Sequence, residues 1–194
     1  MTATPSRLLL CVLSLAAAWS LLGCTSSGDG GNIGPVLARG GEYTSSIADV
    51  PAGSVFLEQS TDQPTSFCLD VRVEAVVDLW AVAFTLAYDD TVIDFSSSQS
   101  GGFLGSTTQA TTLIETNPGE VVVGIARRAD QVSTGVTSGD PGTENPVVTL
   151  CFDILDASTD SPIQFVPNSA GLDSNKVQII GLADFYGGTI STNL

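Results

Sequence analysis

The sequence predicts an all-β protein whose strands stack as a β-sandwich in one domain. Beyond about Ser54, no stretch shows the hydrophobic period of an amphipathic helix. Short runs rich in β-branched and aromatic residues occur instead, and turn-forming Gly, Pro, Asp and Asn cluster between them. Because 43% of the 194 residues are hydrophobic and only 14% are charged, the chain can build a core.

The first residues are predicted to be a lipoprotein signal peptide, residues 1–23. One positive charge, on Arg7, precedes an apolar run over residues 8–22 that is too short and too rich in Ala and Ser for a permanent membrane span. The run ends in Leu21-Leu22-Gly23-Cys24, the pattern of a lipoprotein cleavage site. We therefore expect an exported lipoprotein, lipidated on Cys24 and anchored to the outer membrane or cell surface. The alternative is an ordinary secretory signal with a chance cysteine.

Residues 24–53 are predicted to be the lipidated cysteine and a flexible tether. The segment 25–41 is rich in Gly and Ser and has no sustained hydrophobic period. A flexible segment of that length spans roughly 20 to 25 Å. The folded domain is expected over residues 54–194, which is an ordinary size for one domain.

The predicted domain contains a series of short strand segments, of which about nine should pair as antiparallel strands. Turn-forming residues separate them, for example Asp62-Gln63-Pro64 and Asn117-Pro118-Gly119. In chain order, the segments are residues 54–59, 67–76, 80–88, 91–96, 111–116, 120–126, 147–155, 163–166, 176–180 and 185–190.

Period-two alternation is clearest in the second, third and seventh segments. In the third, Val82, Phe84 and Leu86 share one face, so this face is expected to be buried. Cys68 and Cys151 lie on the faces opposite the large apolar side chains of the second and seventh segments. If these two strands are antiparallel neighbours, a disulfide can join them, as an oxidising compartment would favour. The alternative is two free thiols.

Several of these segments resemble strands of cohesin domains. The resemblance covers about residues 54–190 and rests on Val71–Val77, Leu79–Asp89, Val92–Phe95, Val147–Leu155 and Phe185–Ile190. It implies a cohesin-like jelly-roll sandwich in which the second and seventh strands pair. It also implies an interaction module that binds dockerin modules.

The resemblance further implies a partner face on the third, fifth and sixth strands. Its outward positions on the third strand are Ala81, Ala83, Thr85 and Ala87. These positions are often polar in cohesins, whereas here they offer few hydrogen-bonding groups. The Pro of the cohesin Tyr-Asp-Pro corner is replaced by Asp90.

The residues present exclude several function classes and leave two open. The chain has no His, and no pair of acids is placed as in a glycosidase, so we expect no enzyme activity. A formal charge of −15 makes nucleic acid a poor partner. We expect a membrane-anchored module for protein interaction or adhesion, with a dockerin-type partner. The alternative is a carbohydrate-binding lipoprotein associated with polysaccharide degradation.

Cofactors and metals are not expected. Acidic residues near Asp140 and Glu144, and Asp173 with Asn175, could supply oxygen ligands to a structural calcium, but neither group has the spacing of a calcium-binding loop. Trp80 is in register with Val82 and Phe84 and is therefore expected to pack in the core instead of forming a sugar platform.

Overall fold

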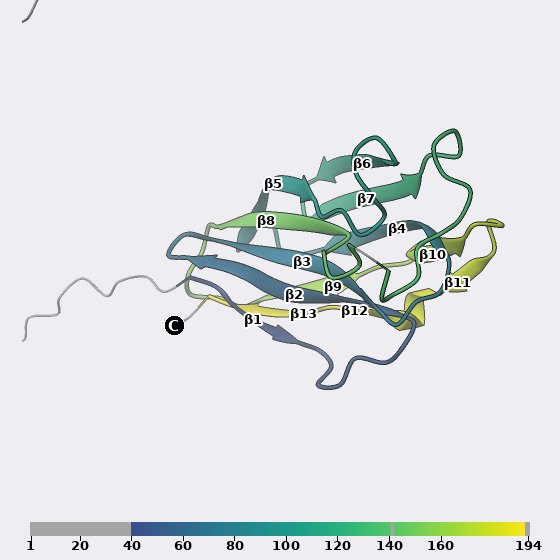
Figure 1. The fold of residues 1–194 in the computed structure, drawn as a ribbon. Coiled ribbons are helices and arrows are strands. Elements are labelled where there is room, and N and C mark those ends of the chain that lie inside the picture. Colours follow the sequence, from purple (N-terminus) through teal and green to yellow (C-terminus); the bar gives the residue numbers. More distant parts are fainter. Residues whose placement is uncertain (1–39, 141, 193–194) are drawn as a thin grey trace, which may run out of the picture. The chain divides into compact units, whose positions relative to one another are not determined.

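Two β-sheets face each other across a hydrophobic core in the computed structural model, which describes residues 40–140 and 142–192 (Figure 1). The larger sheet contains β1 (Glu42–Ser45), β4 (Leu79–Ala87), β6 (Ala110–Asn117), β7 (Glu120–Arg127), β9 (Ser161–Phe165), β10 (Ala170–Asp173), β11 (Gln178–Ile180) and β13 (Gly188–Ser191). The smaller sheet contains β2 (Ser54–Gln63), β3 (Ser66–Glu74), β5 (Ile93–Ser100), β8 (Val148–Ile154) and β12 (Phe185–Tyr186). A short 3-10 helix, η1, spans Leu182–Asp184. No helix in this part of the chain has the length and apolar character of a membrane span.

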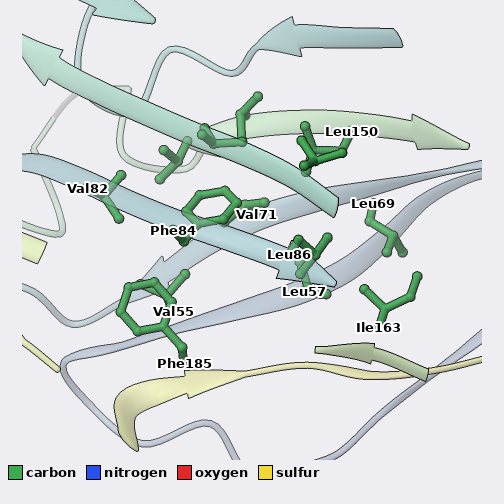
Figure 2. Packing of buried hydrophobic residues seen from close by; sticks show 14 of the residues in the cluster. Val55, Leu57, Leu69, Val71, Val82, Phe84, Leu86, Leu150, Ile163 and Phe185 are labelled. Carbon is green, nitrogen blue, oxygen red and sulfur yellow. The ribbon is translucent and has the colours of Figure 1, made fainter. Parts of the chain in front are cut away.

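The predicted all-β sandwich is confirmed, and its core includes the alternating residues of the third predicted segment. Val82, Phe84 and Leu86 on β4 are no more than 2% exposed, as are Phe67 and Leu69 on β3. Figure 2 shows side chains of both sheets meeting in this layer. Burial of these side chains supplies the main driving force for folding.

Strand order places β4 at the centre of the larger sheet. One edge of β4 pairs with β7, which in turn pairs with β6. The other edge pairs with β10 near the start of β4 and with β9 near its end. The predicted third, fifth and sixth strands are therefore direct neighbours, in the order β6, β7, β4.

The predicted boundary between tether and domain at residue 54 is wrong. Residues Glu42–Ser45 form β1, which pairs with β13 along the edge of the larger sheet. The side chain of Gln59 on β2 also holds this strand, because its Nε2 donates to the Gly41 carbonyl (2.7 Å) and its Oε1 accepts from the Tyr43 N–H (2.8 Å). The folded domain thus begins before residue 54, inside the segment assigned to the tether.

The closing segment differs from the single antiparallel strand that the sequence predicted. Phe185–Tyr186 pairs parallel to β2 in the smaller sheet, whereas Gly188–Ser191 belongs to the larger sheet. The chain crosses between the sheets at Gly187 and Gly188. A Cβ atom on Gly187 would lie 2.2 Å from the Ile163 carbonyl oxygen, and one on Gly188 would lie 2.2 Å from that of Thr44. Only glycine permits so close an approach at these positions.

Replacing Gln59 with Ala should loosen β1 selectively. The substitution removes the acceptor of the Tyr43 N–H and the donor to Gly41, so we expect a loss of about 1 to 3 kcal/mol in the free energy of unfolding. Hydrogen exchange at the Tyr43 amide should accelerate, whereas exchange at the Phe84 amide on β4 should stay unchanged. Equal acceleration at both sites would show that Gln59 stabilises the whole domain and not β1 in particular. Gln99→Ala, at an exposed position of β5, is the matched control.

Candidate functional site

The candidate site is the solvent side of β6, β7, β4 and β10, which we call the outer face. The predicted residues Ala81, Ala83, Thr85 and Ala87 all lie on this side of β4, where they alternate with the buried residues of the core. Ala83 is exposed, and the other three are half-buried. The register places Gly124 of β7 and Ala170 of β10 on either side of Ala83. The middle of the outer face is therefore a row of small side chains.

Two residues of this face were not identified from the sequence. Leu113 on β6 lies opposite Gly124 and is 59% exposed, although it is a large hydrophobic residue. A Cβ atom built on Gly124 would have no heavy atom within 4 Å, so the space above this residue is open. A glycine inside a strand often marks a place where another backbone or a ligand approaches closely. That signal was available in the sequence, but the pairing of Gly124 with Leu113 was not.

The charged side chains of the outer face lie on either side of its uncharged middle row. Along the outward side of β7, Glu120 stands at one end, Gly124 at the middle, and Arg128 directly beyond the other end. The N–H of Arg128 donates to the Gln109 carbonyl (2.7 Å), which extends the pairing of β6 and β7 by one step. The Arg128 guanidinium lies 3.5 Å from the Asp130 carboxylate and is half exposed. The middle row is uncharged, with Glu120 and Glu115 on one side of it and the ion pair of Arg128 with Asp130 on the other.

The long connection between β7 and β8 is fixed to the turn before β4. Val136 exchanges two 2.8 Å backbone hydrogen bonds with Leu79. The carboxylate of Asp78 accepts from the Gly135 N–H (2.7 Å) through Oδ1 and from the Ser174 hydroxyl (2.6 Å) through Oδ2. Asp78 therefore joins this connection to the turn between β10 and β11. These hydrogen bonds, from the Ser174 hydroxyl first and the Gly135 N–H second, lower the pKa of Asp78 below the usual value for an aspartate side chain.

Asp78→Asn should make the domain less stable at neutral pH but not in strong acid. Because folding lowers the pKa of Asp78, its ionised form contributes stability above the unfolded-state pKa of 3.8, and this contribution is lost as pH falls through the folded-state value. The difference in urea midpoint between parent and variant should therefore be present at pH 7 and shrink below pH about 4. Gln99→Ala, at an exposed position without a titratable group, is the control. A difference that stays constant from pH 7 to pH 3 would contradict this role of Asp78.

The acids considered for calcium are engaged in their own loops. Asp140 Oδ2 accepts from the Thr137 N–H (3.0 Å), and Glu144 Oε2 accepts from the Gly142 N–H (3.0 Å). Asp173 Oδ1 accepts from the amides of Asn175 and Val177. Within residues 40–140 and 142–192, no group of three or more acidic, Cys or His side chains is arranged to hold a metal ion. Turn closure thus accounts for these carboxylates.

Aromatic side chains do not form an exposed platform in the described part of the chain. Trp80 is 5% exposed, and the Lys176 ammonium lies 3.8 Å from the centre of its ring. This contact is a cation–π interaction that covers the indole. Phe103 is also buried, while Tyr43 and Tyr186 are half-buried. Within residues 40–140 and 142–192, every aromatic side chain is buried or half-buried.

Cys68 and Cys151 lie directly opposite each other on the antiparallel strands β3 and β8, and a disulfide joins them. This bridge links two central strands of the smaller sheet, on the side of the sandwich away from the outer face. Cys24, the predicted lipidation site, and the whole predicted signal peptide lie outside the described residues.

Comparison with known proteins identifies this arrangement of strands. The sequence matches no family model, and no curated protein matches it. Solved structures of cohesins match the fold. The sixth cohesin of scaffoldin B from Acetivibrio cellulolyticus, solved in complex with a dockerin, gives a TM-score of 0.56 at 12% identity, over 70% of this chain and 95% of that one.

Two further solved structures give similar values. A type II cohesin domain from the cellulosome of Acetivibrio cellulolyticus has a TM-score of 0.56 at 14% identity, over 74% of this chain and 96% of that one. A non-cellulosomal cohesin from the archaeon Archaeoglobus fulgidus has a TM-score of 0.50 at 11% identity, over 70% and 87%. At these identities the match concerns the fold alone. The described domain has the jelly-roll fold of cohesin modules.

Proposed function

We propose that this protein is an interaction module that binds a protein partner of the dockerin type through its outer face. The observation that carries this proposal is the uncharged row at the centre of four adjacent strands, in which Leu113 and Ala83 are exposed and Gly124 and Ala170 are half-buried. Three of these side chains are no larger than a methyl group, so a partner can approach the sheet backbone closely. Solvent-exposed apolar surface bordered by charged residues is typical of a protein-binding site.

We also propose that the domain is displayed on a membrane, at the outer membrane or cell surface, through lipid attached to Cys24. The tripartite pattern of residues 1–24 supports this localisation. A processed lipoprotein carries more than one acyl chain, which is enough for stable anchoring. The module would then hold its partner at the membrane.

We propose no catalytic activity for this chain. Candidate acids such as Asp78 and Asp140 serve loop hydrogen bonds, and the chain has no His. The absence of an exposed aromatic ring among the described residues gives the alternative, a carbohydrate-binding lipoprotein, less support than a protein partner. Nucleic acid is disfavoured by the formal charge of −15.

The test is direct binding of the detergent-purified full chain to a panel of purified dockerin modules, with and without calcium. We expect at least one dockerin to bind, and Ala83→Arg to weaken that binding by about tenfold or more, because it places a long charged side chain at the centre of the face. Gln99→Arg, on the opposite sheet, should bind as the parent does.

Two outcomes would contradict the proposed function. Binding of a dockerin that is equally strong in the parent and in Ala83→Arg would move the site away from the outer face. Failure of every dockerin to bind, with co-sedimentation of the parent on an insoluble polysaccharide, would favour the carbohydrate-binding alternative.

A further inference from the structure

The outer face is complementary to itself. Gly124 lies four residues from Glu120 on β7 and four residues from Arg128, which directly follows β7, and period-two alternation puts the three residues on the same side. If a second copy is laid face to face with its β7 antiparallel and its Gly124 over the first Gly124, Glu120 of each copy faces Arg128 of the other. The reverse orientation, with parallel strands, would set Glu120 over Glu120. Charge thus selects one of the two arrangements.

The rest of the face fits the same two-fold axis. The axis runs across the strands through the row of Leu113, Gly124, Ala83 and Ala170, so each of these residues meets its own counterpart. Leu113, which is 59% exposed, is the one large side chain of the row. It lies at β6 and would pack against the Leu113 of the second copy. The small residues on β7 and β4 then let the two sheets approach closely.

We propose that this chain forms a two-fold symmetric dimer through the outer face, with β7 packed antiparallel on β7. An isologous interface requires this kind of self-complementary surface, in which residue i contacts j and j contacts i. Two sheets packed face to face keep their strands within about 30° of each other. Glu115, on the same side of the middle row as Glu120, offers a second acceptor for Arg128, so an ion pair can still form when the strands cross at such an angle.

The size of the face makes the dimer a weak one. Four strands about 4.8 Å apart and four rows about 7 Å apart cover roughly 500 Å² per copy. Stable complexes bury about 800 Å² per partner. Like charge on the two copies, −15 by sequence, opposes association further, whereas the Glu120–Arg128 pairs favour it, and salt screens both. If the outer face also binds a partner, which rests on the proposed function, dimerisation would compete with that partner.

Cysteine cross-linking of the detergent-purified full chain tests the dimer. Gly124→Cys places a thiol on the two-fold axis, and the structure has room for it because no atom lies within 4 Å of the Cβ position. Under mild oxidation we expect about tenfold more disulfide-linked dimer from this variant than from Gln99→Cys, whose thiol lies on the opposite sheet. The Gln99→Cys variant controls for cross-linking through Cys11 or Cys24 and for random contacts within micelles. Equal yields from the two variants would overturn the proposal.

Charge reversal in the Gly124→Cys background tests the orientation. Glu120→Arg and Arg128→Glu should each lower the yield by about tenfold, because each places like charges opposite one another. The double exchange should restore it, since Glu and Arg again face each other. A double variant as poor as either single variant would overturn the antiparallel arrangement. Failure of dockerins to bind leaves these results unaffected, so the dimer and the proposed function are tested separately.

Discussion

Replacing both Cys68 and Cys151 with Ser should lower the free energy of unfolding by about 4 kcal/mol. The disulfide closes a loop of 83 residues, and cross-linking so long a loop removes much conformational entropy from the unfolded chain. The two cysteines lie on adjacent central strands, β3 and β8, so the native backbone needs no movement to form the bond. Because stabilities of single domains are typically about 5 to 15 kcal/mol, this loss is a large fraction of the total.

Guanidinium unfolding of parent and double variant measures the effect, with the reducing agent dithiothreitol as a matched control. Reduction should lower the midpoint of the parent to that of the variant and leave the variant unchanged. Alkylation followed by peptide mapping gives an independent readout. Modification of Cys68 and Cys151 in the unreduced parent would contradict the bridge, and an unchanged midpoint in the variant would contradict its contribution to stability.

Phe152→Ala should cost about 3 to 5 kcal/mol, the second large effect. Phe152 on β8 is fully buried, with its ring centre 5.5 Å from that of Phe67, 5.3 Å from Tyr88 and 5.9 Å from Phe95. These rings come from both sheets, since Tyr88 follows β4. The substitution leaves a cavity at their junction, and the fixed strands can close it only in part.

Chemical unfolding again provides the measurement, and Leu155→Ala is the control. Leu155 lies just past the end of the same strand and is 59% exposed, so its truncation should change stability by less than about 0.5 kcal/mol. Phe152→Leu should fall between the two, because it restores part of the lost volume. A cost for Phe152→Ala as small as that for Leu155→Ala would contradict the central position of this ring.

The central strands could be predicted because their own residues define them. Phe67, Val82 and Phe152 belong to runs in which heavy apolar residues alternate with lighter ones, and burial of one face fixes such a strand. The edge strand β1 could not be found in this way. Its sequence, Glu-Tyr-Thr-Ser, has no apolar alternation, and its pairing partner, β13, lies at the far end of the chain.

The candidate site could be predicted only along β4, where Ala81 to Ala87 alternate with core residues. What surrounds these alanines depends on register between strands that are distant in sequence. The pairing of Ala83 with both Gly124 and Ala170 is one example. The division of the final segment at Gly187 depends likewise on where the Ile163 carbonyl lies, which only the folded structure gives.

The position of the disulfide determines how the domain would respond to a pulling force. Tension applied at residue 40 would load β1 first, through its ladder with β13 and its hydrogen bonds to Gln59. Unfolding under force could extend only the chain outside the bridge. The disulfide prevents extension of the 83-residue loop between Cys68 and Cys151, which corresponds to about 280 Å of extended chain. Strands β4, β6 and β7 all lie within that protected length. The bridge would therefore protect most of the outer face from mechanical extension after β1 has detached.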